Sequence, residues 1–542
     1  MRILRGQGAS EGIAFGRLKF CRHDEELGVQ RHPAEDAAAE VKRFTDAAEL
    51  VRQQLEHLHE KTVSSLGEEN ALLFEVHQMI LEDPDFQDAV QEEITVGHSY
   101  AEYAVHKVGS FFAKRFSEME SPYLQGRSAD VEDLTRQLIR ALLGKTDEMA
   151  SDSEEPVILA ADDLVPSETA RLDRTKVLAF VTARGSLTSH TAIFARTMGI
   201  PAITGLGEAL LKEADGAAAA VDGSCGMLFI EPGPSCRKEL EEKQAEADRC
   251  RTEAEYFRGK PTRSAGGRTI RLFANVGGLD DVELAVRNDA EGIGLLRSEF
   301  LYLQSSDYPE EELLFSAYRR TLERMNGRQV IIRTLDIGAD KQAAYFHIEP
   351  EQNPALGLRA IRLCLKRPDL FRTQLRAIYR ASAFGCAAIM FPMITSVDEV
   401  VRAKEAAASA RAELAAEGIA FDPHVPVGIM IETPAAALLS GELAQEVDFF
   451  SVGTNDLTQY TLALDRQNPA VAAFGDPHHE AVLRLIEMAA DSAHRAGIWI
   501  GICGELGADV SLLPRFLAAG IDELSVTASA ILPLRAKIAE LP

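Results

Sequence analysis

His190 stands in a segment whose residue types suit nucleophilic chemistry on a phosphoryl group. Residues 185–196 read Gly-Ser-Leu-Thr-Ser-His-Thr-Ala-Ile-Phe-Ala-Arg and follow an apolar run over 177–181. Ser189 suits a helix N-cap, which predicts that His190 opens a helix. Amides at a helix N-terminus favour an anion, and neutral imidazole can act as a nucleophile. Arg196, under two turns further on, could reach phosphoryl oxygens, whereas a lone histidine without this setting would most often be structural.

A second set of chemically capable side chains follows short apolar runs in the C-terminal half of the chain. Its members are Arg297, Arg333, Lys341, Arg359, Arg362, Glu432, Asn455, Asp456, Arg466 and Cys503. A single arginine at a strand end most often makes a surface salt bridge. Several arginines at one rim would repel one another without an anion between them, and guanidinium forks match phosphate and carboxylate oxygens. The set therefore indicates a small, highly anionic ligand.

The acidic and thiol members of this set indicate a cation and a proton donor. Glu432 and Asp456 would balance a divalent cation, and Mg²⁺ typically takes one or two protein carboxylates together with substrate oxygens and water. Cys503 has no second soft ligand beside it, so we interpret it as a proton donor and not as a metal ligand. The alternative for Cys503 alone is a small buried side chain.

The elements that must position these side chains are short apolar runs separated mostly by helical stretches. The runs begin near Ile270, Gly292, Val330, Ala387, Val427, Asp448, Trp499 and Glu523. Eight such β/α repeats over about 275 residues predict a TIM (β/α)8 barrel, whose catalytic side chains stand at the C-terminal ends of the strands. A doubly wound open sheet is the alternative.

The N-terminal half divides into an α/β part and a helical part. Residues 1–20 and 146–232 carry short apolar runs and turns, and they predict one α/β domain. Residues 21–145 have helical periodicity, which predicts an α-helical domain inserted into the first. Residues 233–260 are charged nearly all round, as in a connecting helix, and 261–542 form the barrel. The fold class we expect is multidomain α/β.

Composition restricts the partners and the compartment. The 542 residues carry a net charge of −27, which disfavours nucleic acid and anionic membranes but suits a basic protein partner. No apolar stretch approaches the ~20 residues that span a bilayer, and residues 1–6 lack a signal-peptide core. The seven cysteines include no Cys-x-x-Cys pair. We therefore expect a cytoplasmic protein without structural disulfides or membrane insertion.

Three segments give the sequence a resemblance to a known family. These are Thr188-Ser189-His190-Thr191-Ala192-Ile193 with Ala195-Arg196, Gly453-Thr454-Asn455-Asp456-Leu457-Thr458-Gln459-Tyr460, and Leu73-Phe74-Glu75-Val76-His77-Gln78-Met79-Ile80-Leu81-Glu82-Asp83-Pro84. The first resembles a phosphohistidine signature, the second a phosphoenolpyruvate (PEP) site signature, and the third part of a carrier-binding helical insert. Over nearly its whole length the chain resembles Enzyme I of the PEP-dependent sugar phosphotransferase system, and more broadly the PEP-utilising enzymes.

The resemblance implies a function and a role for each matching residue. The enzyme would transfer the phosphoryl group of PEP to its own His190 and then to the carrier protein HPr, releasing pyruvate as the first step of sugar uptake. Thr169 would be a hydrogen-bonding neighbour of His190, with Arg196 near it. Arg297, Arg333, Asn455 and Arg466 would bind PEP with Lys341 and Arg359 nearby, Glu432 and Asp456 would hold Mg²⁺, and Cys503 would protonate the enolate. A homodimer through the barrels is also implied.

The chain differs from the family pattern in two respects, and two other functions share some of its features. Many members of the family carry a Gly-Gly pair where this chain has Gly185-Ser186-Leu187, and the chain ends soon after the eighth run, so we expect any longer C-terminal extension to be missing. PEP synthase and pyruvate-phosphate dikinase share both signatures but need an ATP-binding domain, for which no segment is left. A catalytically inactive regulatory protein on the same scaffold is disfavoured by the complete set of Arg, Glu, Asp and Cys residues.

Overall fold

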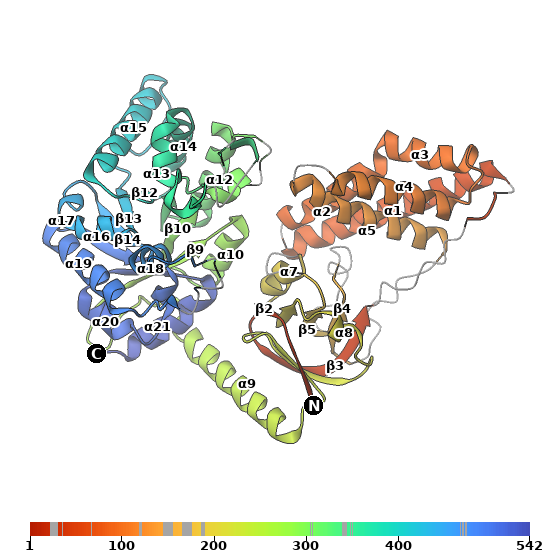
Figure 1. Ribbon diagram of the computed structural model, residues 1–542, viewed down its shortest axis with the longest axis horizontal. Coiled ribbons are helices and arrows are strands. Elements are labelled where there is room, and N and C mark those ends of the chain that lie inside the picture. Colours follow the sequence, from red (N-terminus) through yellow and green to blue (C-terminus); the bar gives the residue numbers. More distant parts are fainter. Residues whose placement is uncertain are drawn as a thin grey trace. The chain divides into compact units, whose positions relative to one another are not determined.

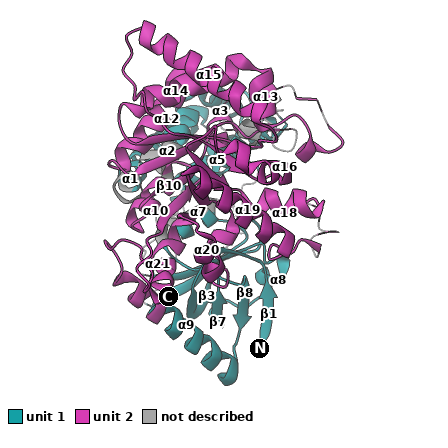
Figure 2. Ribbon diagram, turned by 90° about the vertical axis from the view of Figure 1, so that its left-hand side faces the viewer, with its two compact units in different colours: residues 1–248 teal, residues 249–542 magenta. Residues whose placement is uncertain are grey.

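The computed structural model divides the chain into two compact units, residues 1–248 and 249–542 (Figures 1 and 2). The structure describes residues 1–21, 31–34, 36–66, 68–118, 122–144, 155–164, 176–185, 190–303, 305, 307–338, 344–346, 348–349, 351–466, 468, 471 and 474–542. Within these described residues, no helix has the length and apolar character needed to cross a membrane.

The first unit contains a mixed sheet of eight strands. They are β1 (Arg2–Arg5), β2 (Gln7–Ser10), β3 (Ile13–Cys21), β4 (Val157–Ala161), β5 (Val177–Thr182), β6 (Ala202–Thr204), β7 (Ala218–Asp222) and β8 (Met227–Ile230), in the order β1-β8-β7-β3-β4-β5-β6-β2. Strands β3 to β6 pair in parallel. Apolar side chains such as Ile158, Val181 and Val221 are fully buried against the sheet. The sheet thus joins the first 21 residues to strands that begin more than 130 residues later in the chain.

Between β3 and β4 the chain forms long helices that lie side by side (Figure 1). They are α1 (Ala37–Leu66), α2 (Glu68–Glu82), α3 (Pro84–Thr95), α4 (Ala101–Ser117) and α5 (Pro122–Leu142). Asp83 caps α3 by accepting a hydrogen bond from the Asp85 amide at 2.8 Å, and Pro84 fits the first turn, which needs no amide donor. The helices enclose their own core around Val51, Leu55 and Leu134, as the sequence periodicity predicts.

Helix α9 (Pro234–Glu255) follows β8 and is polar on most of its surface. Its first half is attached to the first unit, because Lys243 pairs with the buried Asp222 at 2.5 Å and Gln244 donates to the Ile13 carbonyl at 3.0 Å. The predicted connecting helix is therefore present, and it begins at Pro234.

The second unit is a closed barrel of eight parallel strands, which confirms the predicted TIM barrel and rules out an open sheet. The strands are β9 (Arg271–Val276), β10 (Gly292–Arg297), β11 (Gln329–Arg333), β12 (Ala387–Phe391), β13 (Val427–Ile431), β14 (Phe449–Val452), β15 (Trp499–Ile502) and β16 (Glu523–Val526), and β16 closes onto β9. Each strand begins within one residue of the start predicted from the sequence.

Helices surround the barrel (Figure 1). They are α10 (Leu279–Arg287), α11 (Glu299–Leu303), α12 (Glu311–Arg324), α13 (Ala360–Lys366), α14 (Pro368–Ser382), α15 (Val397–Ala416), α16 (Pro434–Leu438), α17 (Ser440–Leu443), α18 (Thr454–Leu462), α19 (Glu480–Ala496), α20 (Leu513–Ala519) and α21 (Ile531–Glu540), with 3-10 turns at Ala344–Phe346, Pro354–Leu356, Glu505–Ala508 and Ala528–Ala530. Strand β14 ends at Val452, and Thr454 opens α18.

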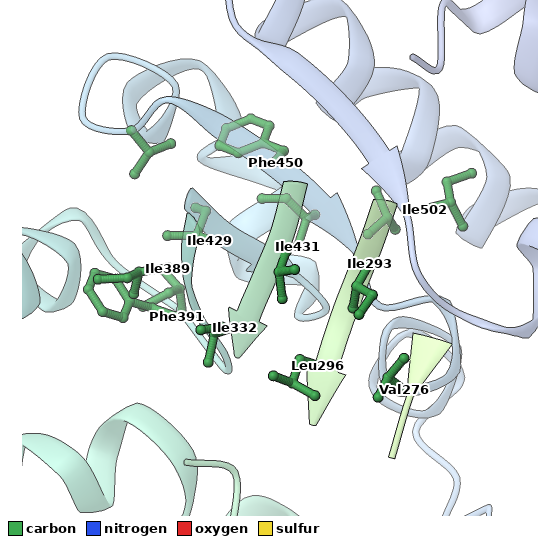
Figure 3. Packing of buried hydrophobic residues seen from close by; sticks show 14 of the residues in the cluster. Val276, Ile293, Leu296, Ile332, Ile389, Phe391, Ile429, Ile431, Phe450 and Ile502 are labelled. Carbon is green, nitrogen blue, oxygen red and sulfur yellow. The ribbon is translucent and has the colours of Figure 1, made fainter. Parts of the chain in front are cut away.

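Alternate residues of each barrel strand face two different cores. The side chains directed toward the helices form one large apolar cluster, part of which Figure 3 shows around Ile332, Ile389, Ile429 and Ile431. The side chains directed into the barrel form a second cluster. Its members are Phe273, Leu295, Ile331, Ala388, Met390, Met430, Phe449, Cys503 and the half-buried Trp499. The barrel interior is therefore filled, and ligand chemistry is confined to its rim.

Candidate active site

The predicted catalytic side chains gather at the C-terminal rim of the barrel. Arg297 and Arg333 end β10 and β11, Glu432 directly follows β13, and Cys503 directly follows β15. Asp456 lies in the first turn of α18, four residues after β14 ends. Because all eight strands are parallel, these positions share one rim.

Arg333 is held in a buried ladder of alternating charges. Its guanidinium lies 2.9 Å from the Glu299 carboxylate and 3.1 Å from the Asp336 carboxylate, and Asp336 in turn lies 2.8 Å from the Arg359 guanidinium. All four side chains are at least nine-tenths buried. Burial acts to lower the pKa of Arg333, but Glu299 and Asp336 outweigh it and raise the pKa. Arg333 and Arg359 are thus fixed as cations before any ligand arrives.

Glu299 is a site residue that the sequence did not single out. Besides pairing with Arg333, it accepts a hydrogen bond from the Asp336 amide at 3.1 Å, so it orients the loop after β11. The available signal was its place two residues beyond Arg297, where β10 leaves the barrel. Glutamate side chains are mostly exposed, so the position alone does not indicate that Glu299 is buried or that it pairs with Arg333.

Glu432 and Asp456 form the acidic part of the rim. Glu432 is 1% exposed, and its carboxylate accepts a hydrogen bond from the Met393 amide at 2.5 Å. Burial and the neighbouring Asp456 and Asp336 carboxylates raise the pKa of Glu432 to about 8. A side chain at Gly453 would come within 2.9 Å of Glu432 Oε2, so glycine is needed there to leave room for the carboxylate.

This acidic pair fits a divalent cation. Asp456 Oδ1 is buried and has no hydrogen-bond partner among the described residues. No group of three or more His, Cys, Asp or Glu side chains suited to a metal occurs in the part of the chain that the structure describes. Two carboxylates, one of them with an unused oxygen, are what Mg²⁺ takes when substrate and water supply its other ligands. Carboxylate oxygens also suit Mg²⁺ better than softer metals.

The remaining predicted ligands of the anion lie at the exposed edge of the rim. Arg297 is exposed and makes no hydrogen bond or ion pair with a described residue. Arg466 is 42% exposed in its side chain and lies 3.9 Å from the Asp456 carboxylate. Asn455 donates to Glu505 at 3.0 Å and accepts from the Glu505 amide at 3.4 Å. Unlike Arg333, Arg297 has a guanidinium that is still available to a ligand.

Cys503 lies beneath this rim as a thiol. It is 4% exposed, and its Sγ donates to the Val452 carbonyl at 3.5 Å. Burial is the main cause that raises the pKa of Cys503 to about 12, and the Glu523 and Glu432 carboxylates add to it. The side chain therefore stays protonated at neutral pH and suits an acid better than a thiolate nucleophile.

Buried polar atoms without partners surround the same region. Among the described residues, Arg333 Nε, Thr334 Oγ1, Thr454 Oγ1 and Asp456 Oδ1 are buried without a hydrogen bond. Buried polar groups are normally paired, so such a concentration indicates that a polar ligand or water completes them. The rim is therefore built to receive an oxygen-rich molecule.

In the first unit, α7 (His190–Met198) begins at His190, as the sequence predicted. Arg196 donates to the Ala9 carbonyl at 3.2 Å, an interaction that holds it toward β2. Thr169, residues 186–189 and Lys341 lie outside the described residues, as does the side chain of His190. The structure thus locates the His190 backbone at a helix N-terminus, where an anion is favoured.

Known proteins match this chain from end to end. The PEP-binding domain of PEP-utilising enzymes matches residues 251–542, the N-terminal domain of these enzymes matches 5–127, and their mobile domain matches 153–226. The chain therefore belongs to the PEP-utilising enzymes.

Full-length relatives narrow this assignment. Phosphoenolpyruvate-protein phosphotransferases of Bacillus sp. (strain S) and Bacillus subtilis (strain 168) are 42% and 41% identical to this chain, covering 100% of it and 93% and 95% of their own lengths. The same enzyme of Haemophilus influenzae is 40% identical, covering 98% of this chain and 92% of its own length. Within the PEP-utilising enzymes, the chain belongs with the phosphoenolpyruvate-protein phosphotransferases, the Enzyme I family.

Proposed function

We propose that this enzyme transfers the phosphoryl group of PEP to His190 and from there to a histidine of the carrier protein HPr, releasing pyruvate in the first step of sugar uptake. The observation that carries the proposal is the barrel rim, where fixed guanidinium groups, two carboxylates and a protonated thiol surround unpartnered polar atoms. Phosphoryl transfer depends chiefly on positioning and charge neutralisation, and this rim supplies both.

The cationic and amide side chains of the rim would bind PEP. They are Arg297, Arg333, Asn455 and Arg466, with Lys341 and Arg359 nearby. Guanidinium forks bind phosphate and carboxylate oxygens in pairs, which suits a substrate that carries both groups. Because Glu299 and Asp336 hold Arg333 in place, binding costs this arginine little conformational entropy.

Glu432 and Asp456 would hold Mg²⁺. The ion would neutralise charge on the phosphoryl oxygens of PEP while His190 attacks. Cys503 would then donate its proton to the methylene carbon of the enolate, which converts the leaving group to pyruvate. Loss of the enolate by protonation makes phosphate transfer from PEP favourable.

The first unit would carry the histidine and the carrier-binding surface. Thr169 and Arg196 would be neighbours of the phosphorylated His190, and the helices of 21–145 would bind HPr. Because His190 and the PEP site belong to different units, His190 must approach the barrel and the carrier in turn. The domain limits remain those predicted from the sequence, and we propose a cytoplasmic homodimer formed through the barrels.

The decisive experiment incubates the enzyme with labelled PEP, Mg²⁺ and HPr, with and without ATP. We expect acid-labile label on the enzyme and on HPr, pyruvate as product, and no need for ATP. H190A should take up no label at any Mg²⁺ concentration, whereas H424A, which changes an exposed histidine of the barrel unit, should label normally. Label persisting in H190A would overturn the assignment of the nucleophile, and a requirement for ATP would favour a dikinase.

A further inference from the structure

Glu523 is a buried carboxyl group that the proposed mechanism does not use. It is the first residue of β16, it is 0% exposed, and neither carboxylate oxygen has a hydrogen-bond partner among the described residues. An unpaired buried carboxyl group destabilises a fold, so its presence in the barrel interior calls for a functional explanation.

Two glycines on other strands make room for this carboxyl group. A Cβ at Gly501 of β15 would lie 1.8 Å from Glu523 Oε2, and a Cβ at Gly294 of β10 would lie 2.5 Å from Glu523 Oε1. The carboxyl group therefore occupies the inward space that side chains on β15 and β10 would otherwise fill. The register agrees, because Gly501 and Glu523 are paired residues of the two strands.

Inward-facing residues of β15 connect the position of Glu523 with that of Cys503. Trp499 and Cys503 both belong to the cluster inside the barrel, so Gly501, midway between them in the sequence, faces the same way. Two residues along a strand span roughly 6.6 Å, so the Glu523 carboxyl group lies about one side-chain layer below Cys503. Ser525 Oγ lies 2.5 Å from the point where a Cβ at Gly294 would stand, as does Glu523 Oε1, so this hydroxyl lies beside the carboxyl group.

The charges around Glu523 favour its protonated form. Burial is the main cause that raises the pKa of Glu523 to about 8, Asp522 adds to it, and Arg271 of β9 opposes it. Asp522 itself lies 3.3 Å from the His494 imidazole and accepts from the Ile500 amide at 3.0 Å. From β15 the titratable neighbour is Cys503, and on β10 the residue that faces the carboxyl group is the uncharged Gly294. At neutral pH this carboxyl group therefore carries a proton that it can donate.

We propose that Glu523 is the group that returns a proton to Cys503 after the thiol has protonated the substrate carbon. The inference rests on the proposed role of Cys503. In the first step the S–H bond breaks and a C–H bond forms, leaving a thiolate and pyruvate. In the second step the Ser525 hydroxyl turns from Asn275 Oδ1, gives its own proton to the thiolate so that the S–H bond re-forms, and takes the proton of Glu523 as that O–H bond breaks. The carboxylate then takes a proton from water, so each turnover consumes one solvent proton.

The direction of this transfer is favourable. A carboxylic acid with a pKa of about 8 is a stronger acid than a thiol with a pKa of about 12, so a proton moves from Glu523 to the thiolate spontaneously. Without such a donor, the buried thiolate could regain a proton only from the substrate side of the rim.

The test measures how fast the enzyme exchanges the methyl protons of pyruvate for solvent deuterium, by proton NMR at saturating Mg²⁺. Exchange requires Cys503 to take a proton from pyruvate and to replace it with deuterium from the solvent. E523Q, which keeps the shape but has no acidic proton, should slow exchange at least about tenfold more than it slows single-turnover labelling of His190 by PEP. E540Q, which changes an exposed glutamate of α21, is the matched control. An equal loss of both activities, or no loss of exchange, would overturn the proposal.

A second measurement needs no variant. Trp499 is the only tryptophan in the chain, it stacks on Phe449 at 4.6 Å, and the Arg271 guanidinium lies 4.3 Å from its ring. Ionisation of Glu523 should draw Arg271 toward it and change the Trp499 fluorescence near pH 8. Because only a thiolate can take a proton from pyruvate, exchange should increase over the pH range in which Glu523 loses its proton and becomes able to accept the proton of Cys503. Exchange that continues unchanged through this fluorescence transition would refute the role of Glu523, whereas C503A exchanging at the wild-type rate would refute the role of Cys503 itself.

Discussion

The unpaired carboxyl group of Glu523 should make the stability of the barrel depend on pH, and E523Q should remove that dependence. Burial raises the pKa of Glu523 from an ordinary value of 4.5 to about 8. Below the lower value the group is protonated in both the folded and the unfolded chain. Between the two values the unfolded chain releases the proton and the folded chain keeps it, so stability falls as the pH rises through this interval.

The size of the effect follows from the same shift. Each pH unit in the interval is worth about 1.4 kcal/mol, so Glu523 should cost the wild-type barrel on the order of 4–5 kcal/mol at pH 8 and above relative to pH 4.5. Glutamine cannot ionise, so E523Q should be more stable than the wild type at pH 8, by a margin that shrinks as the pH is lowered. Glu432 contributes equally to both proteins and cancels in the difference.

Urea unfolding followed by Trp499 fluorescence measures this difference in the full-length chain. Trp499 lies at the start of β15, so its signal reports the barrel and no other part of the protein. We expect the difference in unfolding free energy between E523Q and the wild type to grow steadily from about pH 5 to about pH 8 and then level off. A difference that does not vary with pH would show that Glu523 is already ionised in the folded barrel, and the reasoning from its burial would be wrong.

Three further predictions concern the proposed reaction. D456A, or removal of Mg²⁺ by chelation, should abolish labelling of His190 by PEP, whereas D491A on the outer helix α19 should label normally. C503A should label in a single turnover but form pyruvate at least about tenfold more slowly; undiminished turnover would assign protonation to another group or to water. A fragment ending near Arg258 should exchange phosphoryl groups with phosphorylated HPr and remain inert toward PEP, since every residue proposed to bind PEP lies beyond it. Direct phosphorylation of this fragment by PEP would require the barrel roles to be withdrawn.

The barrel could be predicted from the sequence because its signals are local. Parallel strands covered on both faces give short apolar runs. Each run here lies between helical stretches that are long enough for their periodicity to be recognised in the sequence. The end of β14 has no such local signal. Gly453 follows the apolar run directly, and Thr454 opens α18 with Asp456 in its first turn, where an acidic side chain is favoured.

The partners of the site residues could not be predicted, because they depend on contacts between distant strands. Glu299 meets Arg333 only because β10 and β11 are paired with Arg297 opposite Arg333. The sequence predicts Glu523 only as the start of the eighth apolar run, and nothing in that run indicates that its side chain points into the barrel. Its burial depends on the absence of side chains at Gly294 and Gly501, which lie more than 200 and more than 20 residues away along the chain.

The structure distinguishes buried, ion-paired arginines from an exposed one, a difference that the sequence does not indicate. Arg333 and Arg359 are buried and already neutralised by Glu299 and Asp336, so an anion that reaches them must share their hydrogen-bonding groups with these carboxylates. Arg297 is exposed and makes no such pair with a described residue. Long-range attraction of a substrate anion therefore depends mainly on the exposed arginine, because a paired charge exerts little field at a distance. Once the anion is bound, the fixed pair provides preorganised positive charge for phosphoryl transfer, and neither Arg333 nor Arg359 has to be ordered during the reaction.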